Sequence, residues 1–107
     1  MSEKVQILRP AGRLDSASSP VLEREATELI DGGGRRLLID FERLDYISSA
    51  GLRAALAVAK RMNAAGGKLA LCSLRPQVAE VFEISGVDAI IDIHASPESA
   101  TAHLTAG

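Results

Sequence analysis

Two adjacent serines, Ser48 and Ser49, are the residues of this sequence best placed to do chemistry. An apolar run at 37–39 precedes them, and apolar residues at helical spacing follow them from Leu52 to Met62. The serines therefore lie where a buried strand is followed by a helix. The first N–H groups of a helix lack partners within it, and the helix dipole adds partial positive charge there. A hydroxyl at this point can cap the helix, and a phosphate on it would be stabilised.

A serine between a strand and a helix is also typical of the hydrolase nucleophile, in the pattern Gly-x-Ser-x-Gly. Ser49 and Gly51 match the second half of that pattern, but Ile47 stands where the first glycine is required. The only histidines, His94 and His103, come late in the chain, and little sequence remains for a substrate pocket. We therefore expect no catalytic residues and no enzyme. A plain helix cap and a phosphorylation site remain as the two interpretations of Ser49.

A run of three glycines at 32–34 is the other motif that could bind phosphate. A P-loop requires Lys followed by Ser or Thr after its last glycine, whereas Arg35 and Arg36 follow here. The run also closes a helix before a strand, instead of opening a helix after one. We interpret it as the end of a helix, where glycine is favoured.

Composition excludes several functional classes. The formal net charge of the 107 residues is -2 and only 3% are aromatic, so neither a basic surface nor a stacking platform for nucleic acid is expected. The single Cys72 and two separated histidines indicate no disulfide and no metal site. No apolar run reaches membrane-spanning length, and the first four residues do not resemble a signal peptide. We expect a cytoplasmic protein without cofactors.

Strands and helices are expected to alternate along the chain. A turn is predicted at 12–15, and Ser19 with Pro20 is predicted to begin the first helix. The predicted strands are 5–8, 36–41, 68–73 and 88–93, and the later helices start at Ser48–Ser49, Pro76 and Pro97. This alternation predicts one α/β domain, residues 1–107, with a mainly parallel sheet of about four to five strands and flanking helices.

The segment 44–52 resembles the central motif of the STAS domain family, the bacterial anti-sigma-factor antagonists. The segment 12–15 resembles the Gly-x-Leu-Asp turn of that family, and 66–68 and 81–86 resemble its later segments. Each segment alone is weakly specific, whereas the ordered set is specific and covers nearly the whole chain.

This resemblance implies a partner-switching function. In such antagonists the unmodified domain binds an anti-sigma factor that is also a serine kinase, and so frees the sigma factor. The kinase phosphorylates a serine at the helix start, which ends the complex, and a serine phosphatase reverses the modification. The matching serine is Ser49, with Ser48 as the second choice. The implied partner surface comprises Asp15, Ser48, Ser49, Gly51, Leu52 and Arg53.

The sequence departs from the family pattern at one position of this motif. The family often has an acidic residue before its phosphoacceptor, and Ser48 stands there instead. The main alternative is therefore a STAS scaffold that is never phosphorylated, such as the small subunit of a lipid-transport ABC system. Arg53 lies one helical turn beyond Ser49, where it is suited either to pair with a phosphate or to remain a solvated surface residue.

Overall fold

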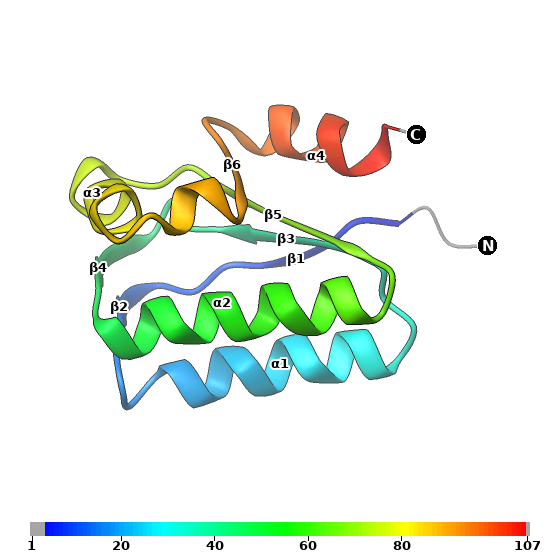
Figure 1. Cartoon of the computed structure of the whole chain (residues 1–107), viewed down its shortest axis with the longest axis horizontal. Coiled ribbons are helices and arrows are strands. Elements are labelled where there is room, and N and C mark those ends of the chain that lie inside the picture. Colours follow the sequence, from blue (N-terminus) through cyan, green and yellow to red (C-terminus); the bar gives the residue numbers. More distant parts are fainter. Residues whose placement is uncertain (1–3, 107) are drawn as a thin grey trace.

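Residues 4–106, which a computed structural model describes, form short strands and helices that alternate along the chain (Figure 1). The strands are β1 (Gln6–Leu8), β2 (Gly12–Leu14), β3 (Arg36–Asp40), β4 (Leu44–Ile47), β5 (Lys68–Cys72) and β6 (Asp92–His94). The helices are α1 (Ser19–Asp31), α2 (Ser49–Ala64), α3 (Pro76–Ser85) and α4 (Pro97–Thr105), with a 3-10 helix η1 at Val87–Ala89.

Four of these strands form one parallel sheet in the order β1-β3-β5-β6. The remaining two, β2 and β4, pair with each other in a separate two-stranded parallel sheet. Figure 1 shows α1 and α2 side by side on one face of the larger sheet and α4 on the opposite face. The predicted α/β class and mainly parallel sheet are therefore confirmed.

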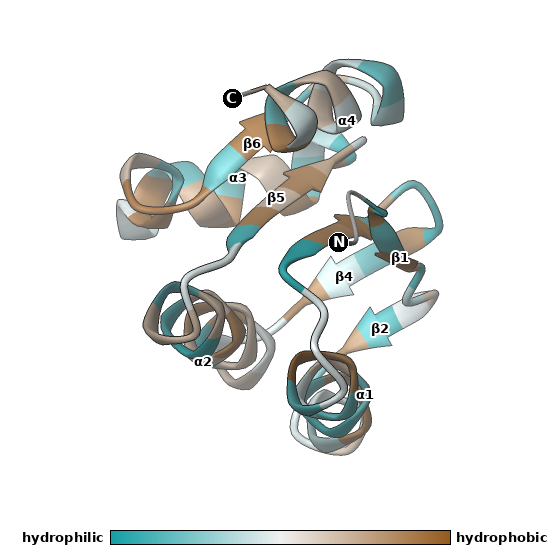
Figure 2. Cartoon of the chain, turned by 90° about the vertical axis from the view of Figure 1, so that its right-hand side faces the viewer, coloured by the Kyte–Doolittle hydropathy of each residue, from teal (hydrophilic) through white to brown (hydrophobic). Residues whose placement is uncertain are grey.

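Successive side chains of the central strands supply two separate hydrophobic cores, because they point to opposite faces of the sheet. Leu37 and Ile39 belong to the larger core, which also holds buried residues of α1, α2 and α3. Leu38 lies between them in sequence but packs with Ala100 and Leu104 of α4 in the smaller core. The strand that the sequence predicts as buried is therefore buried on both faces. Figure 2 shows hydrophobic colour along most of its neighbour β5.

Glycines end two of the helices, and at the first of them, α1, the sequence predicts it. Gly33 has φ of 100° and its N–H donates to the Ile30 carbonyl, 3.0 Å away, after the last turn of α1. Gly86 has φ of 80° and closes α3 in the left-handed conformation. Only glycine adopts these conformations without strain, so both turns depend on their glycines.

The strand predicted at 88–93 is wrong in its first half. Val87–Ala89 forms the 3-10 helix η1, and β6 begins only at Asp92. Val87 and Ile91 are both buried in the larger core. Ile91 is the fourth residue after Val87, and that spacing fits a tight turn as well as a strand, so the pattern alone did not distinguish a turn from a strand.

Two predictions near the start of the chain are also wrong. Gly12–Leu14 is the strand β2, not a turn, and its partner β4 was not predicted as a strand. Ser18, not Ser19, is the N-cap of α1, and Ser19 is buried as the first helical residue. The first error concerns pairing with a strand distant in sequence, and the second concerns the loop before the helix. Short local patterns encode neither.

No helix within residues 4–106 is long and apolar enough to cross a membrane. The predicted domain boundaries at 1 and 107, and most of the segment assessed as a signal peptide, lie outside the described residues.

Candidate functional site

Ser48 is the N-cap of α2, directly after β4. Its hydroxyl accepts a hydrogen bond from the Gly51 N–H at 3.3 Å and donates one to the Leu14 carbonyl at 3.3 Å. The Ser48 N–H donates to the same carbonyl at 2.9 Å. The Ser48 side chain therefore joins the start of α2 to the end of β2, and it is half-buried in doing so.

Ser49 occupies the first position of α2, and its environment is different. It is exposed, and its hydroxyl has no hydrogen-bond partner among residues 4–106. It also lies within the first turn, where the N–H groups and the helix dipole favour negative charge. Of the two candidate serines, Ser49 has the hydroxyl that a second protein can reach without disrupting the fold.

Gly51 and Leu52 fix the position of this helix start. Gly51 is buried against β2 and β4: a Cβ at this position would collide with the Leu14 carbonyl oxygen and lie 2.7 Å from Cγ1 of Ile47. Leu52 packs, half-buried, against the larger core. Both predicted partner residues therefore bring the first turn of α2 close to the two-stranded sheet.

Asp15 lies at the same end of the molecule as the two serines. It follows β2 as Ser48 follows β4, and these parallel strands place Leu14 opposite Ile47. The Asp15 carboxylate accepts hydrogen bonds from the backbone N–H groups of Ser18 at 3.2 Å and Ala17 at 3.0 Å. Because these bonds favour the charged form, the pKa of Asp15 is lowered. A fixed negative charge thus stands beside the start of α2.

Arg53 is exposed on α2, one turn after Ser49. Its side chain makes no ion pair or hydrogen bond with any other residue between positions 4 and 106. It is therefore free to contact a phosphate or another protein, and both interpretations of this arginine remain predictions.

The structure adds side chains that sequence reasoning missed. The Arg13 guanidinium lies over the Tyr46 ring, with Cζ 4.2 Å from the ring centroid. Asp45, on the same strand as Tyr46, pairs with Arg75 at the start of α3. If β4 had been recognised as a strand, Asp45 and Tyr46 would have been candidates for exposed side chains on it. They lie between the buried residues Leu44 and Ile47. Figure 1 shows these elements gathered at one end of the molecule, around the start of α2.

Comparison with known proteins identifies the family. The family model for the STAS domain matches residues 2–100, and the chain belongs to this family. BtrV of Bordetella bronchiseptica, provisionally named an anti-sigma factor antagonist, is 50% identical over 91 residues, which are 85% of this chain and 78% of BtrV. The anti-sigma-B factor antagonist of Bacillus subtilis is 34% identical over 88 residues, 82% of this chain and 80% of that protein.

The fold is also that of a solved structure. The Bacillus cell fate determinant SpoIIAA, in its phosphorylated form, superposes with a TM-score of 0.73 at 22% identity. The match covers 95% of this chain and 92% of SpoIIAA. At this level of identity the likeness establishes a shared fold.

Proposed function

We propose that this protein is an anti-sigma-factor antagonist that works by partner switching in the cytoplasm. In its unmodified form it binds an anti-sigma factor that is also a serine kinase. Phosphorylation of Ser49 by that kinase ends the complex, and a serine phosphatase restores the binding form. The names of the two relatives described above support this function, and ATP and magnesium belong to the kinase.

The observation that carries the proposal is the exposed hydroxyl of Ser49, which has no hydrogen-bond partner within residues 4–106, beside the bonded hydroxyl of Ser48. A kinase must bring the acceptor oxygen within reach of the γ-phosphate of ATP, and Ser49 presents that oxygen at the surface. Modification of Ser48 would remove a helix cap worth about 1 kcal/mol. The geometry therefore favours Ser49 as the phosphoacceptor. A structure of SpoIIAA in its phosphorylated form has the same fold, which supports the proposal.

The switch follows from charge at a helix start. A phosphate adds about -1.5 to -2 charges at pH 7. At an exposed helix N-terminus this charge is favourable by roughly 0.3–1 kcal/mol, so the fold should survive. Within an interface that covers Ser49, an unpaired buried charge costs roughly 3–5 kcal/mol. Since about 1.4 kcal/mol is a tenfold change, binding should weaken by hundreds-fold or more.

The remaining predicted residues have separate roles in the proposed partner surface. Asp15, Ser49 and Arg53 offer polar groups to the partner. Gly51 acts through its lack of a side chain, because it lets the start of α2 lie against β2. Ser48 and Leu52 hold that helix start through the cap and the core, so their effect on binding is one of position.

Phosphorylation in vitro tests the proposal directly. Candidate anti-sigma factor kinases encoded in the same genome would be purified and incubated with this chain, ATP and magnesium, and tandem mass spectrometry would locate the phosphate. We expect phosphate on Ser49 in the wild type and in Ser48→Ala, and none in Ser49→Ala. Phosphate on Ser48 alone would reassign the acceptor. No binding and no phosphorylation by any candidate would favour the unphosphorylated STAS scaffold instead.

A further inference from the structure

Arg13 and Tyr46 form an ordered pair on the outer face of the two-stranded sheet. Tyr46 is the only tyrosine in the sequence and is 42% exposed. The two residues are opposite each other in the register of β2 and β4, and the guanidinium covers one part of the ring. A cation above an aromatic face is attracted by the ring quadrupole, so the ring is held in place before any partner arrives.

Ion pairs restrain the polar groups around this ring. The Arg13 Nε lies 3.5 Å from the Asp15 Oδ2 atom, so the guanidinium joins Tyr46 to the loop beside Ser49. On the other side Asp45 pairs with Arg75, whose Nε donates to the Glu42 carbonyl at 2.9 Å. The charges of Arg13 and Asp15 cancel beside the exposed ring, whereas Asp45, the residue before Tyr46 on β4, is directed to the opposite face of the strand. This arrangement resembles the aromatic anchor and polar rim of a protein interface.

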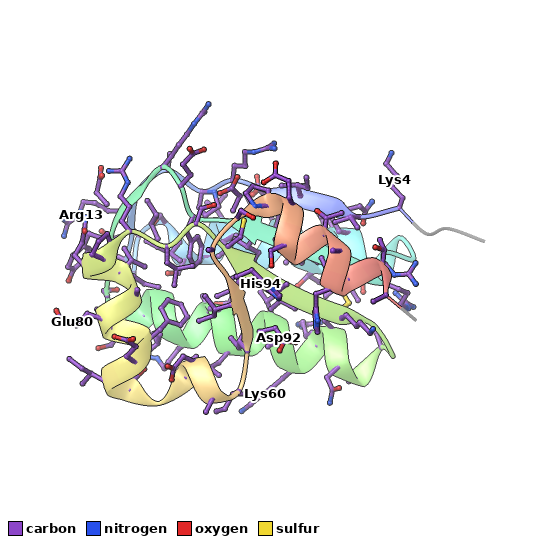
Figure 3. The ribbon with its side chains drawn as sticks, turned by 90° about the horizontal axis from the view of Figure 1, so that it is seen from above. Lys4, Arg13, Lys60, Glu80, Asp92 and His94 are labelled. Atoms are coloured by element: carbon purple, nitrogen blue, oxygen red, sulfur yellow. The ribbon has the colours of Figure 1, made fainter. Side chains whose placement is uncertain are left out.

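We propose that Tyr46, with Arg13 stacked on it, is an anchor of the surface that binds the anti-sigma factor kinase; this inference rests on the function proposed above. The pair is continuous with the phosphorylation site, because Tyr46 precedes Ser49 by three residues and Arg13 precedes Asp15 by two. In Figure 3, Arg13 lies at the end of the molecule where α3 is found, far from Lys4. A kinase that covers Ser49 would also reach this ring.

The chemistry of the pair indicates what the partner must supply. The free part of the ring needs an apolar side chain packed against it. The terminal N–H groups of Arg13 have no hydrogen-bond partner within residues 4–106 and can donate to a carboxylate. The matching surface on the kinase is therefore an apolar depression with an acidic residue at its edge. Tyrosine and arginine are, with tryptophan, the residue types enriched at the energetic centres of interfaces.

Ile90 provides a matched exposed residue outside this surface. The Ile90 side chain is 70% exposed. It lines a groove of about 520 Å³ together with Lys60 and Asn63, two residues of the second half of α2. Asn63 is 14 residues beyond Ser49, or about 20 Å along the helix at 1.5 Å per residue. An interface centred on Ser49 and Tyr46 should therefore be insensitive to Ile90.

Affinity measurements with the kinase that modifies Ser49 test the inference. The unphosphorylated wild type, Tyr46→Ala, Tyr46→Phe, Arg13→Gln and Ile90→Ala would be titrated into that kinase by calorimetry, with melting temperatures measured alongside. We expect Tyr46→Ala to weaken binding tenfold or more, and Arg13→Gln to weaken it several-fold. Tyr46→Phe and Ile90→Ala should remain within about twofold of the wild type. All melting temperatures should stay within a few degrees.

The outcomes separate this inference from the proposed function. A wild type that binds the kinase and releases it on phosphorylation, together with a Tyr46→Ala variant of unchanged affinity, would overturn the anchor alone. A weaker Tyr46→Ala variant with an equal loss in Ile90→Ala would also overturn it, because the effect would then not be local. If the wild type binds no anti-sigma factor kinase, the proposed function fails and the anchor fails with it.

Discussion

At the residue scale, the start of α2 places two hydroxyl groups in different surroundings. The Ser48 hydroxyl bonds to two backbone groups, one in α2 and one in β2. The Ser49 hydroxyl faces outward from the first helical position. A kinase can reach the second without loss of a bond that holds the fold. Stability should therefore depend on Ser48 and modification on Ser49. Substituting each serine in turn separates the two properties.

Ser48→Ala should destabilise the protein, whereas Ser49→Ala should not. Removal of a serine N-cap costs about 1 kcal/mol, which corresponds to a fall of about 4–8 °C in the melting temperature of a domain of this size. Alanine is a good helix former at the first helical position, so Ser49→Ala should melt within about 2 °C of the wild type. Thermal unfolding followed by circular dichroism would measure both. A large fall for Ser49→Ala would instead make Ser49 a structural residue.

Asp15→Asn should remove a pH-dependent part of the stability. The N–H groups of Ser18 and Ala17 hold the folded pKa of Asp15 below its ordinary value of 3.8. A carboxyl group with a depressed folded pKa stabilises the folded state above its unfolded pKa, and this contribution is lost as the pH falls through the folded value. The difference in urea stability between wild type and Asp15→Asn should therefore be full above about pH 5 and shrink below 3.8. A difference that stays constant down to pH 3 would contradict this cause.

The sequence predicts Ser49, Gly51, Leu52 and Asp15 as site residues but does not point to Arg13 and Tyr46, which the structure adds to the proposal. The first four follow from the resemblance of two segments, 12–15 and 44–52, to motifs that can be read along the chain. Arg13 and Tyr46 meet only because two strands about thirty residues apart pair, with a register shift after Gly12 that sets Arg13 opposite Tyr46. A pairing over that separation is decided by packing of the whole chain, which local residue patterns do not contain.

At the element scale, the close contact between α2 and the two-stranded sheet determines where the start of α2, and with it Ser49, lies. Gly51 allows the helix backbone to approach the Leu14 carbonyl, and Ser48 bonds to the same carbonyl. Helices and the central strands were predictable, because their apolar residues recur at clear spacings and glycines mark their ends. The strands β2 and β4 have three and four residues, too short for alternation to be distinctive.

Gly51→Ala should destabilise the protein although alanine favours helices. Alanine gains about 1 kcal/mol over glycine inside a helix. Its Cβ, however, would collide with the Leu14 carbonyl and the Ile47 side chain. The Leu14 backbone has little freedom to move, and overpacking typically costs about 1–3 kcal/mol. After the gain from helix propensity, the free energy of unfolding should fall by up to about 2 kcal/mol. Urea unfolding would measure it, with Ser49→Ala as the control on the same turn. A more stable Gly51→Ala variant would show that α2 can shift.

At the scale of the whole molecule, the site lies at one end of the fold, at the margin of the larger core. The larger core is closed by α1, α2 and α3, and the smaller core by α4. Neither core contains Ser49, which is exposed. A charge added there is expected to change the surface that a partner meets and to leave the packing of both cores intact. Switching by modification then requires no change of fold.

Ser49→Asp provides the test of this charge mechanism in the intact molecule. Aspartate adds one negative charge at the helix start, compared with nearly two for a phosphate. We expect the variant to melt at or slightly above the wild-type temperature, because an acidic residue in the first turn is stabilising by roughly 0.3–1 kcal/mol. Its affinity for the kinase should fall by less than that of the phosphorylated chain, and Ser49→Asn, of similar size and no charge, should bind more tightly than Ser49→Asp. Equal affinity of the Asp and Asn variants would show that bulk at the interface, and not charge, ends the complex.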